Sequence, residues 1–211
     1  MILTPIPDEA LAERLQIFAA NLDDPAHRRA FLRFAVPAGA GRAQGAEAER
    51  HHAEALALCA RFGMAWLPGP PSLDFTWNGT HLREETEAYV LIHEAAHFQL
   101  AAPARRHILD FGLGAGPETG ARAEADQAAT VFGIGRDQEE AAASLLGVLW
   151  EAELNQPALA SFIDQNWLEG AERQSTAAFF ASMLDRLAAG GFLDAAYRPT
   201  EQLRLEPDPV A

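Results

Sequence analysis

The sequence predicts a mainly helical fold with a small β element, of the α+β class. Most of the chain places apolar residues at helical spacing. Residues 63–79 differ, because they are rich in proline and hold only short apolar pieces, which suits loops with one or two short strands. No internal repeat is found, so we expect a single domain over residues 1–198 and a flexible polar tail over residues 199–211.

The N-terminal part predicts three helices. The first begins at Asp8, which can cap it, and ends near Leu22. Pro25 then suits the first turn of a short helix that runs to Phe34. Residues 37–45 predict a loop, and a third helix follows at residues 46–62. The apolar stripe of the first helix consists of Leu11, Leu15, Ile17, Phe18 and Leu22.

After the proline-rich stretch, four more helices are expected. Asn78-Gly79 predicts a turn, and Thr80 can cap a helix that runs to about Ala101 and stops before Pro103. Residues 104–120 form a connection with several glycines. The remaining predicted helices cover residues 122–132, 137–154 and 172–189.

The composition limits which partners and which cellular location we expect. The formal net charge is -14, and all of the 16 basic residues are arginines. An acidic surface repels phosphate backbones and anionic lipids, so we expect neither nucleic-acid nor membrane binding. No apolar run reaches the roughly 18 residues that span a bilayer. The first residues lack the pattern of a signal peptide, so we expect a cytoplasmic protein.

The single cysteine, Cys59, excludes an internal disulfide and a cysteine-based zinc cluster. Any metal must therefore be held by nitrogen and oxygen atoms.

The segment His93-Glu94-Ala95-Ala96-His97 carries the chemistry. On a helix, histidines at positions i and i+4 lie on one face, where both can reach one cation. In the zinc proteases, the glutamate of this motif takes a proton from the water that the metal activates. The sequence therefore predicts a zincin-like metal-binding helix, with His93 and His97 as ligands and Glu94 as a catalytic group.

The surroundings of the motif favour a metal over a solvated polar face. The predicted helix is apolar almost all round, and polar side chains inside a buried helix cost free energy unless they are paired or coordinate something. The apolar residues are Ala88, Val90, Leu91, Ile92, Ala95, Ala96, Phe98 and Leu100.

A third ligand is expected from the segment that begins Gln138-Glu139-Glu140 and continues with small residues to Gly147. Small residues let two helices approach closely, so a glutamate on this helix can face the histidines. We favour Glu140, and Glu139 remains the alternative because the periodicity of an alanine-rich helix does not define its rotation. The other histidines receive no role.

Three features follow one another here: His93-Glu94-Ala95-Ala96-His97-Phe98, then Ala104-Arg105-Arg106, then Leu109-Asp110-Phe111-Gly112. Over residues 77–150 the chain thereby resembles the bacterial elongation factor P hydroxylases. That family has the same helix with an aromatic residue after the second histidine, an arginine pair before Asp-Phe-Gly, and a downstream helix with a glutamate.

The resemblance implies a non-haem iron centre and hydroxylation of a modified lysine on elongation factor P. By position, His93, His97 and Glu140 would be the metal ligands, and Glu94 would be an acid or base beside the metal. The group of Arg105, Arg106 and Asp110 would shape the site.

The arginine pair and Asp110 also have roles that need no family. The two arginines offer fixed positive charge to a carboxylate, on a ligand or on Asp110. Asp110 can instead orient a ligand histidine through its second ring nitrogen. A local salt bridge without a part in catalysis is equally compatible.

Three functions remain open at this stage. The first is an iron-dependent hydroxylase that acts on a protein side chain, and the second is a zinc hydrolase in which Glu94 activates water. The third is a helical protein without enzymatic activity, in which the site is structural. A closed structural zinc site normally needs a fourth protein ligand, which the sequence does not supply. Metal identity, cosubstrate and oligomeric state are not predicted.

Overall fold

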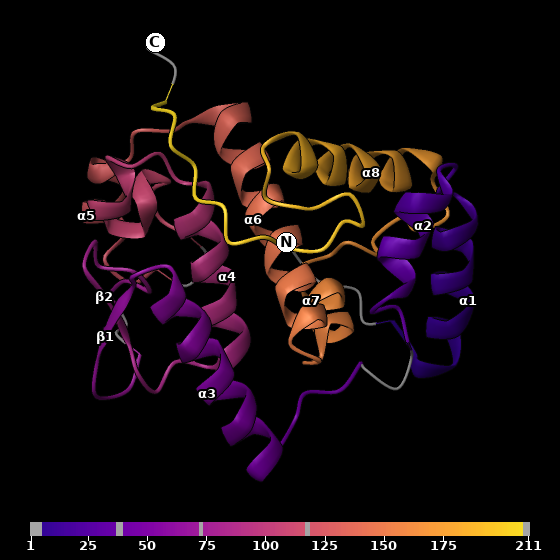
Figure 1. Cartoon of the computed structure of the whole chain (residues 1–211), viewed down its shortest axis with the longest axis horizontal. Coiled ribbons are helices and arrows are strands. Elements are labelled where there is room, and N and C mark those ends of the chain that lie inside the picture. Colours follow the sequence, from indigo (N-terminus) through magenta and orange to yellow (C-terminus); the bar gives the residue numbers. More distant parts are fainter. Residues whose placement is uncertain (1–5, 37–39, 72–73, 117–118, 209–211) are drawn as a thin grey trace. The chain divides into compact units, whose positions relative to one another are not determined.

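The structure is a computed structural model that describes residues 6–36, 40–71, 74–116 and 119–208 (Figure 1). Over these residues the chain is mainly helical with one small two-stranded sheet, which confirms the predicted fold class. The capping role predicted for Asp8 depends on a side chain outside this description. In the described part, no helix combines the length and the apolar character needed to cross a bilayer.

The chain groups into two compact units, where the sequence predicted one domain. Unit 1 consists of Met1–Ala48 and Val148–Thr200, and unit 2 consists of Glu49–Gly147 and Glu201–Ala211. Helix α6 (Gly133–Glu153) contributes its residues up to Gly147 to unit 2 and the remainder to unit 1.

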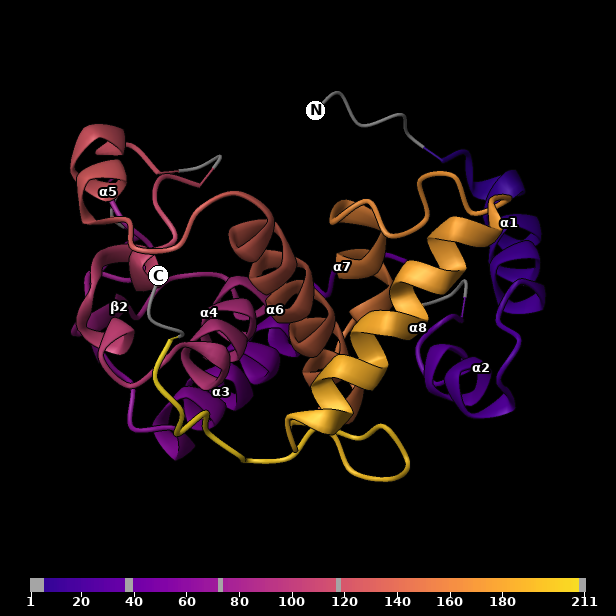
Figure 2. The same ribbon diagram turned by 90° about the horizontal axis from the view of Figure 1, so that it is seen from above.

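Unit 2 is built around helix α4 (Ala88–Leu100), which carries the histidine motif. Helix α4 lies beside α3 (Ala46–Arg61) and α6 in both Figure 1 and Figure 2. The thiol of Cys59 on α3 donates to the backbone oxygen of Leu91 on α4, 3.6 Å away. Cys59 is fully buried, as a small apolar residue would be. The unit also contains α5 (Arg122–Ala128) and two short 3-10 helices, η2 (Arg105–His107) and η3 (Leu109–Gly112).

The small sheet changes one sequence prediction. Strand β1 (Ala65–Leu67) pairs in parallel with β2 (His81–Arg83), so the segment predicted to open the long helix is extended. Thr80 does not cap a helix. Its backbone N–H and its hydroxyl both donate to the Asn78 side chain. Helix α4 therefore begins at Ala88, because pairing with a strand distant in the sequence outweighs local helix propensity.

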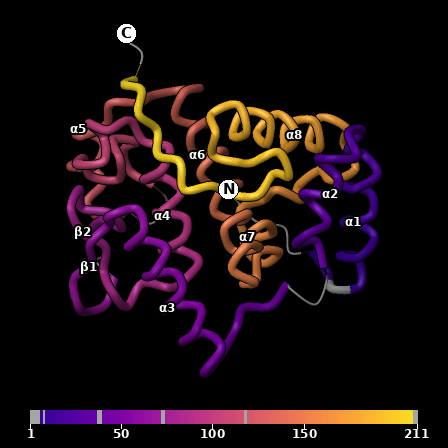
Figure 3. Tube along the Cα trace, viewed as in Figure 1, coloured from indigo at the N-terminus to yellow at the C-terminus, as the bar shows by residue number. Residues whose placement is uncertain are grey.

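The last described residues also differ from expectation. Residues 201–208 were predicted to belong to a flexible tail, because they show no apolar pattern. In the structure, the backbone N–H of Arg204 donates to the carbonyl of Gln99 at the end of α4, 2.9 Å away. Figure 3 lets the reader follow this segment, in yellow, past the end of α4. Polar contacts attach it, and periodicity of apolar residues cannot reveal contacts of that kind.

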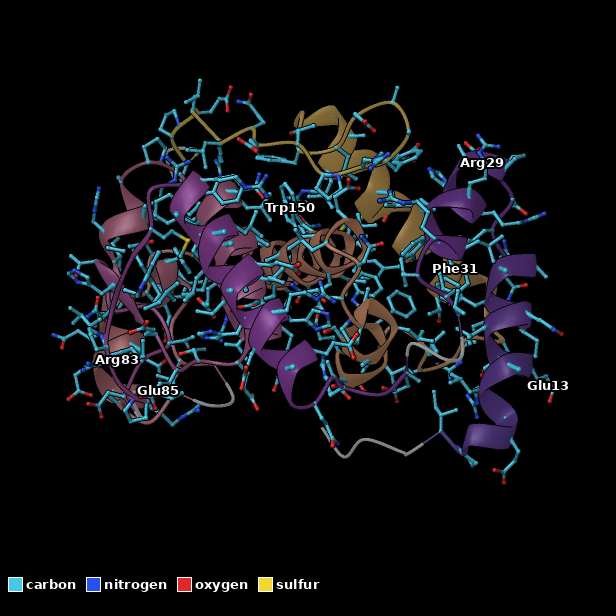
Figure 4. The ribbon with its side chains drawn as sticks, turned by 60° about the horizontal axis from the view of Figure 1, so that its bottom comes forward. Glu13, Arg29, Phe31, Arg83, Glu85 and Trp150 are labelled. Carbon is cyan, nitrogen blue, oxygen red and sulfur yellow. The ribbon has the colours of Figure 1, made fainter. Side chains whose placement is uncertain are left out.

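Unit 1 contains α1 (Asp8–Ala20), α2 (Pro25–Leu32), α7 (Ala158–Asp164) and α8 (Gln174–Ala189). Its core is a cluster of aromatic rings, in which Phe18 and Phe31 have centroids 4.8 Å apart. Figure 4 shows Phe31 inside the unit, whereas Glu13 and Arg29 lie on its outer face. The other rings of the cluster are Phe34, Phe162, Trp167 and Phe180.

Helices α1, α2, α3 and α8 match the prediction to within two residues, whereas α5 ends four residues early and α6 begins four residues early. Helix α7 was not predicted. It has only seven residues, which is too short for a helical period to be recognised. Its residues Ala158 to Phe162 are all buried, so packing within unit 1 stabilises it and local propensity does not.

Unit 1 buries one carboxylic acid. The side chain of Glu151 on α6 is 2% exposed, and its nearest cation is Arg42, 3.6 Å away. Arg42 also donates to Ser161 and Asp164. Burial raises the pKa of Glu151 from 4.5 to about 8, although the hydroxyl of Ser161 and the charge of Arg42 oppose the rise.

This raised pKa predicts a pH-dependent stability. Between pH 4.5 and 8 the folded protein holds a proton on Glu151 that the unfolded chain has released. The free energy of unfolding should therefore fall by a few kcal/mol as the pH rises through this window. Urea unfolding of wild type and Glu151→Gln at several pH values measures the difference. We expect this decrease in the free energy of unfolding to be absent in Glu151→Gln. The control variant Glu153→Gln, on the same helix, should still show it. Parallel curves for wild type and Glu151→Gln would contradict the assignment.

Candidate metal centre

Helix α4 holds its polar residues inside the fold. Glu94 is 8% exposed and His97 is 4% exposed, among apolar neighbours that are almost fully buried. His93 is partly buried. The predicted arrangement, polar side chains in an apolar helix, is therefore confirmed. Because an unpaired buried polar group costs free energy, these side chains need partners or a ligand.

The approach of α6 to α4 follows from a small residue, as the sequence predicted. A Cβ atom added at Gly147 would lie 3.4 Å from the Cα atom of His93. The two helices therefore meet nearly backbone to backbone. Two turns earlier on α6, the carboxylate of Glu140 reaches the histidines, and its Oε2 atom lies 3.4 Å from Nε2 of His97.

His93, His97 and Glu140 form a group that could hold a metal ion. The Nε2 atoms of the two histidines are 3.1 Å apart, and the three ligand atoms all lie within 4.8 Å of one another. Two ligand atoms about 2.1 Å from one ion are about 3.0 Å apart at a right angle and about 3.4 Å apart at the tetrahedral angle. The two spacings at His97, 3.1 Å to His93 and 3.4 Å to Glu140, match those between two ligands of one ion.

The electrostatics of the group favour a positive charge between the three side chains. Burial lowers the pKa of His93 to about 3, and the neighbouring charge of His97 adds to this effect. Burial also opposes charge on His97, but the carboxylate of Glu140 outweighs it and raises the pKa of His97 to about 9. In turn, the pKa of Glu140 falls to about 2, because the charge of His97 exceeds the effect of burial.

An aromatic stack holds the His97 ring. Phe111 lies against it with ring centroids 5.5 Å apart, and Trp77 stacks on Phe111 with centroids 5.6 Å apart. Phe111 reaches this place through a left-handed turn, in which Asp110 has a φ of 41° and Phe111 a φ of 55°. Each such residue costs of order 1–3 kcal/mol and persists only where neighbours enforce it.

Arg105 is the neighbour that enforces the turn. One Nη1 hydrogen bond of 2.8 Å goes to the carbonyl of Phe111. Both terminal nitrogens also bind the carboxylate of Glu139, at 2.8 and 2.6 Å. The two glutamates that the sequence left as alternatives are therefore separated: Glu140 faces the histidines, and Glu139 pairs with Arg105.

Arg106 and Asp110 have different hydrogen-bond partners. Arg106 donates to the carbonyls of Phe98 and Arg204, 2.9 and 2.6 Å away, so these contacts attach the chain near the end of α4. The carboxylate of Asp110 accepts from the hydroxyl of Thr119 at 3.0 Å. Burial raises the pKa of Asp110, and the charges of His97 and Glu140 act on it, which puts it within electrostatic range of the group.

Of the alternatives for Asp110, a contact that orients a ligand histidine is not observed. The Nδ1 atoms of His93 and His97 are buried, and neither has a hydrogen-bond partner in the described part of the structure.

Sequence reasoning missed three residues around the group. They are Trp77, Thr119 and Asp208, to which the sequence assigns no role. Asp208 accepts from the Nε atom of Arg105 at 2.6 Å. A polar residue in a polar tail gives no signal in the sequence, because its partner is distant along the chain.

Comparison with known proteins identifies no relative. A scan of protein-family models, a search of curated proteins and a search of solved structures each find nothing that matches the chain.

The geometry predicts opposite effects for the two neighbouring glutamates. Glu140→Ala should weaken metal binding about 100-fold, and it should destabilise the metal-free protein less than Glu139→Ala, because the Glu140 side chain is partly exposed whereas Glu139 pairs with a buried arginine. Glu139→Ala removes a partner of the buried Arg105, so it should lower the free energy of unfolding by about 3 kcal/mol and retain measurable metal binding. Chelator competition and urea unfolding measure the two quantities. If Glu139→Ala lost the metal and Glu140→Ala kept it, the assignment would be reversed.

Proposed function

We propose that this chain is a metal-dependent oxygenase that hydroxylates a side chain of a protein substrate at a mononuclear iron site. The observation that carries the proposal is the ligand set. Among the described residues, the metal-binding group contains two histidines and one glutamate and no fourth ligand. Two histidines and one carboxylate that leave coordination positions open are typical of non-haem iron oxygenases.

Iron bound there would supply the activation of dioxygen. Hydroxylation inserts one oxygen atom into a C–H bond and reduces the other to water, with two electrons and two protons from an external reductant. Residues of this chain would hold the metal on one side, so that the other side stays open to dioxygen and substrate. The stack of Phe111 on His97 would keep that imidazole in one orientation.

The resemblance, through Asp110-Phe111-Gly112, favours this function over zinc-dependent hydrolysis, in which Glu94 would be the general base. Successive residues of a helix are rotated by about 100°. His93 faces α6 at Gly147, while the charge of Glu94 raises the pKa of Cys59, which is buried on α3. The charge of Glu94 also raises the pKa of His97, so its carboxylate lies within electrostatic range of both Cys59 and the histidine group. A general base for hydrolysis has to lie on the open side of the metal.

The resemblance to the elongation factor P hydroxylases suggests the substrate. We infer a protein side chain as the target, with a modified lysine of elongation factor P as the first candidate. A structural zinc site is disfavoured, since such sites normally have four protein ligands.

The test combines metal content with an assay. Protein purified without chelator or a nickel column, and also after anaerobic reconstitution with iron, is analysed for metals alongside His97→Ala. We expect near-stoichiometric iron in wild type and at least a tenfold loss in the folded variant. Iron-loaded wild type with a reductant should then add the mass of one oxygen atom to modified elongation factor P.

Each outcome has a separate meaning. Zinc that resists replacement by iron, together with peptide hydrolysis that Glu94→Gln abolishes, would support the hydrolase. Equal metal content in wild type and folded His97→Ala would overturn the metal centre itself.

A further inference from the structure

Residues 201–208 form a segment, here called the C-terminal strap, that crosses the end of α4 through polar contacts. Glu201 pairs with Arg61 of α3 at 2.9 Å. The amide of Gln99 donates to the carbonyl of Gln202 at 3.0 Å, and the backbone N–H of Arg204 donates back to the carbonyl of Gln99. Leu205 points outward and is 71% exposed, so burial of large apolar groups does not hold the strap.

The strap ends on Arg105. The carboxylate of Asp208 accepts from Nε of Arg105 at 2.6 Å and from Nη2 at 3.4 Å. The remaining hydrogen bonds of this guanidinium are the two to Glu139 and the one to the carbonyl of Phe111. A guanidinium has five N–H groups, and here five hydrogen bonds occupy them. Arg105 is 2% exposed, so its orientation depends on these partners.

Two of the partners of Arg105 lead directly to the metal-binding group. Glu139 precedes Glu140 on α6, so its pairing with Arg105 sets the rotation of the turn that presents the Glu140 carboxylate. Phe111 carries the ring that stacks on His97. If Arg105 shifts, both contacts shift with it, and they act on two of the three ligands.

We propose that the C-terminal strap is part of the metal centre, with Asp208 as a positioning residue that acts through Arg105 on Glu140 and His97. The inference rests on the proposed metal site. When Asp208 is detached, Arg105 keeps its charge but loses the partner that holds Nε, so it can turn away from the carbonyl of Phe111. Release of the strap should therefore weaken metal binding without unfolding unit 2.

The expected effect is moderate. Replacing a residue that supports a metal ligand typically costs 10–100-fold in metal affinity. Asp208 acts through one more side chain and is 34% exposed, so we expect the lower end, about tenfold.

Cobalt(II) alone is a suitable probe, because its visible spectrum reports the number and geometry of the ligands. Wild type, Asp208→Asn and Glu206→Gln are titrated with cobalt, and the unfolding midpoint of each metal-free protein is recorded. Glu206 is the matched control. Glu206 is exposed and lies on the same strap. It is not among the described hydrogen-bond partners of Arg105. We expect Asp208→Asn to raise the Kd for cobalt about tenfold and to change the visible bands, and Glu206→Gln to do neither.

Two further measurements keep the result decisive. Asp208→Glu retains the charge and should restore most of the affinity. Deletion of residues 201–211 should weaken cobalt binding at least as much as Asp208→Asn. Wild-type binding that Asp208→Asn and the deletion both leave unchanged would overturn the role of the strap and leave the metal site intact. Failure of wild type to bind cobalt would overturn the proposed function instead.

Discussion

Gly147 on α6 contacts the backbone of His93 on α4, and this contact sets the distance between the two helices. The candidate metal centre depends on that distance. Because a glycine lies where the backbones meet, a carboxylate two turns earlier on α6 can come within 3.4 Å of an imidazole on α4. An alanine Cβ atom there would just touch the backbone of His93, so a residue larger than alanine would separate the helices and move the Glu140 carboxylate away from the histidines. The distance between α4 and α6 thus also determines how the candidate ligands lie relative to one another.

Around that contact, the protein keeps its side chains in place with charge and aromatic stacking. Arg105 joins α6 and the left-handed turn, and through Asp208 it also joins the strap. The turn is strained at Asp110 and Phe111, and its strain is maintained by the hydrogen bond from Arg105 and by the stack of Trp77, Phe111 and His97. Contacts of this kind would hold the three candidate ligands in place if a metal ion binds there.

Much of the fold could be predicted from sequence, because helices such as α1, α3 and α8 bury a stripe whose period is visible in the residues themselves. Where the outcome depends on distant partners, prediction failed. Thr80 was predicted to cap a helix, but the next residues pair with a strand sixteen positions earlier, from Ala65↔His81 to Leu67↔Arg83. Helix α7 is too short to show a period.

The candidate site, like the fold, could be predicted only in part from the sequence. The spacing of His93 and His97 predicted two of its members, and the small residues before Gly147 correctly predicted the close approach of α6. Periodicity alone could not separate Glu139 from Glu140, because that choice depends on where Arg105 lies. The part played by Asp208 could not be predicted at all, since nothing in a polar tail indicates which buried cation it will meet.

X-ray absorption spectroscopy of the metal-loaded protein tests the central claim, that His93, His97 and Glu140 hold one ion, most directly. The account predicts a shell of nitrogen and oxygen ligands with the multiple-scattering signal of two imidazoles. A sulfur ligand, or a spectrum without histidine scattering, would contradict it.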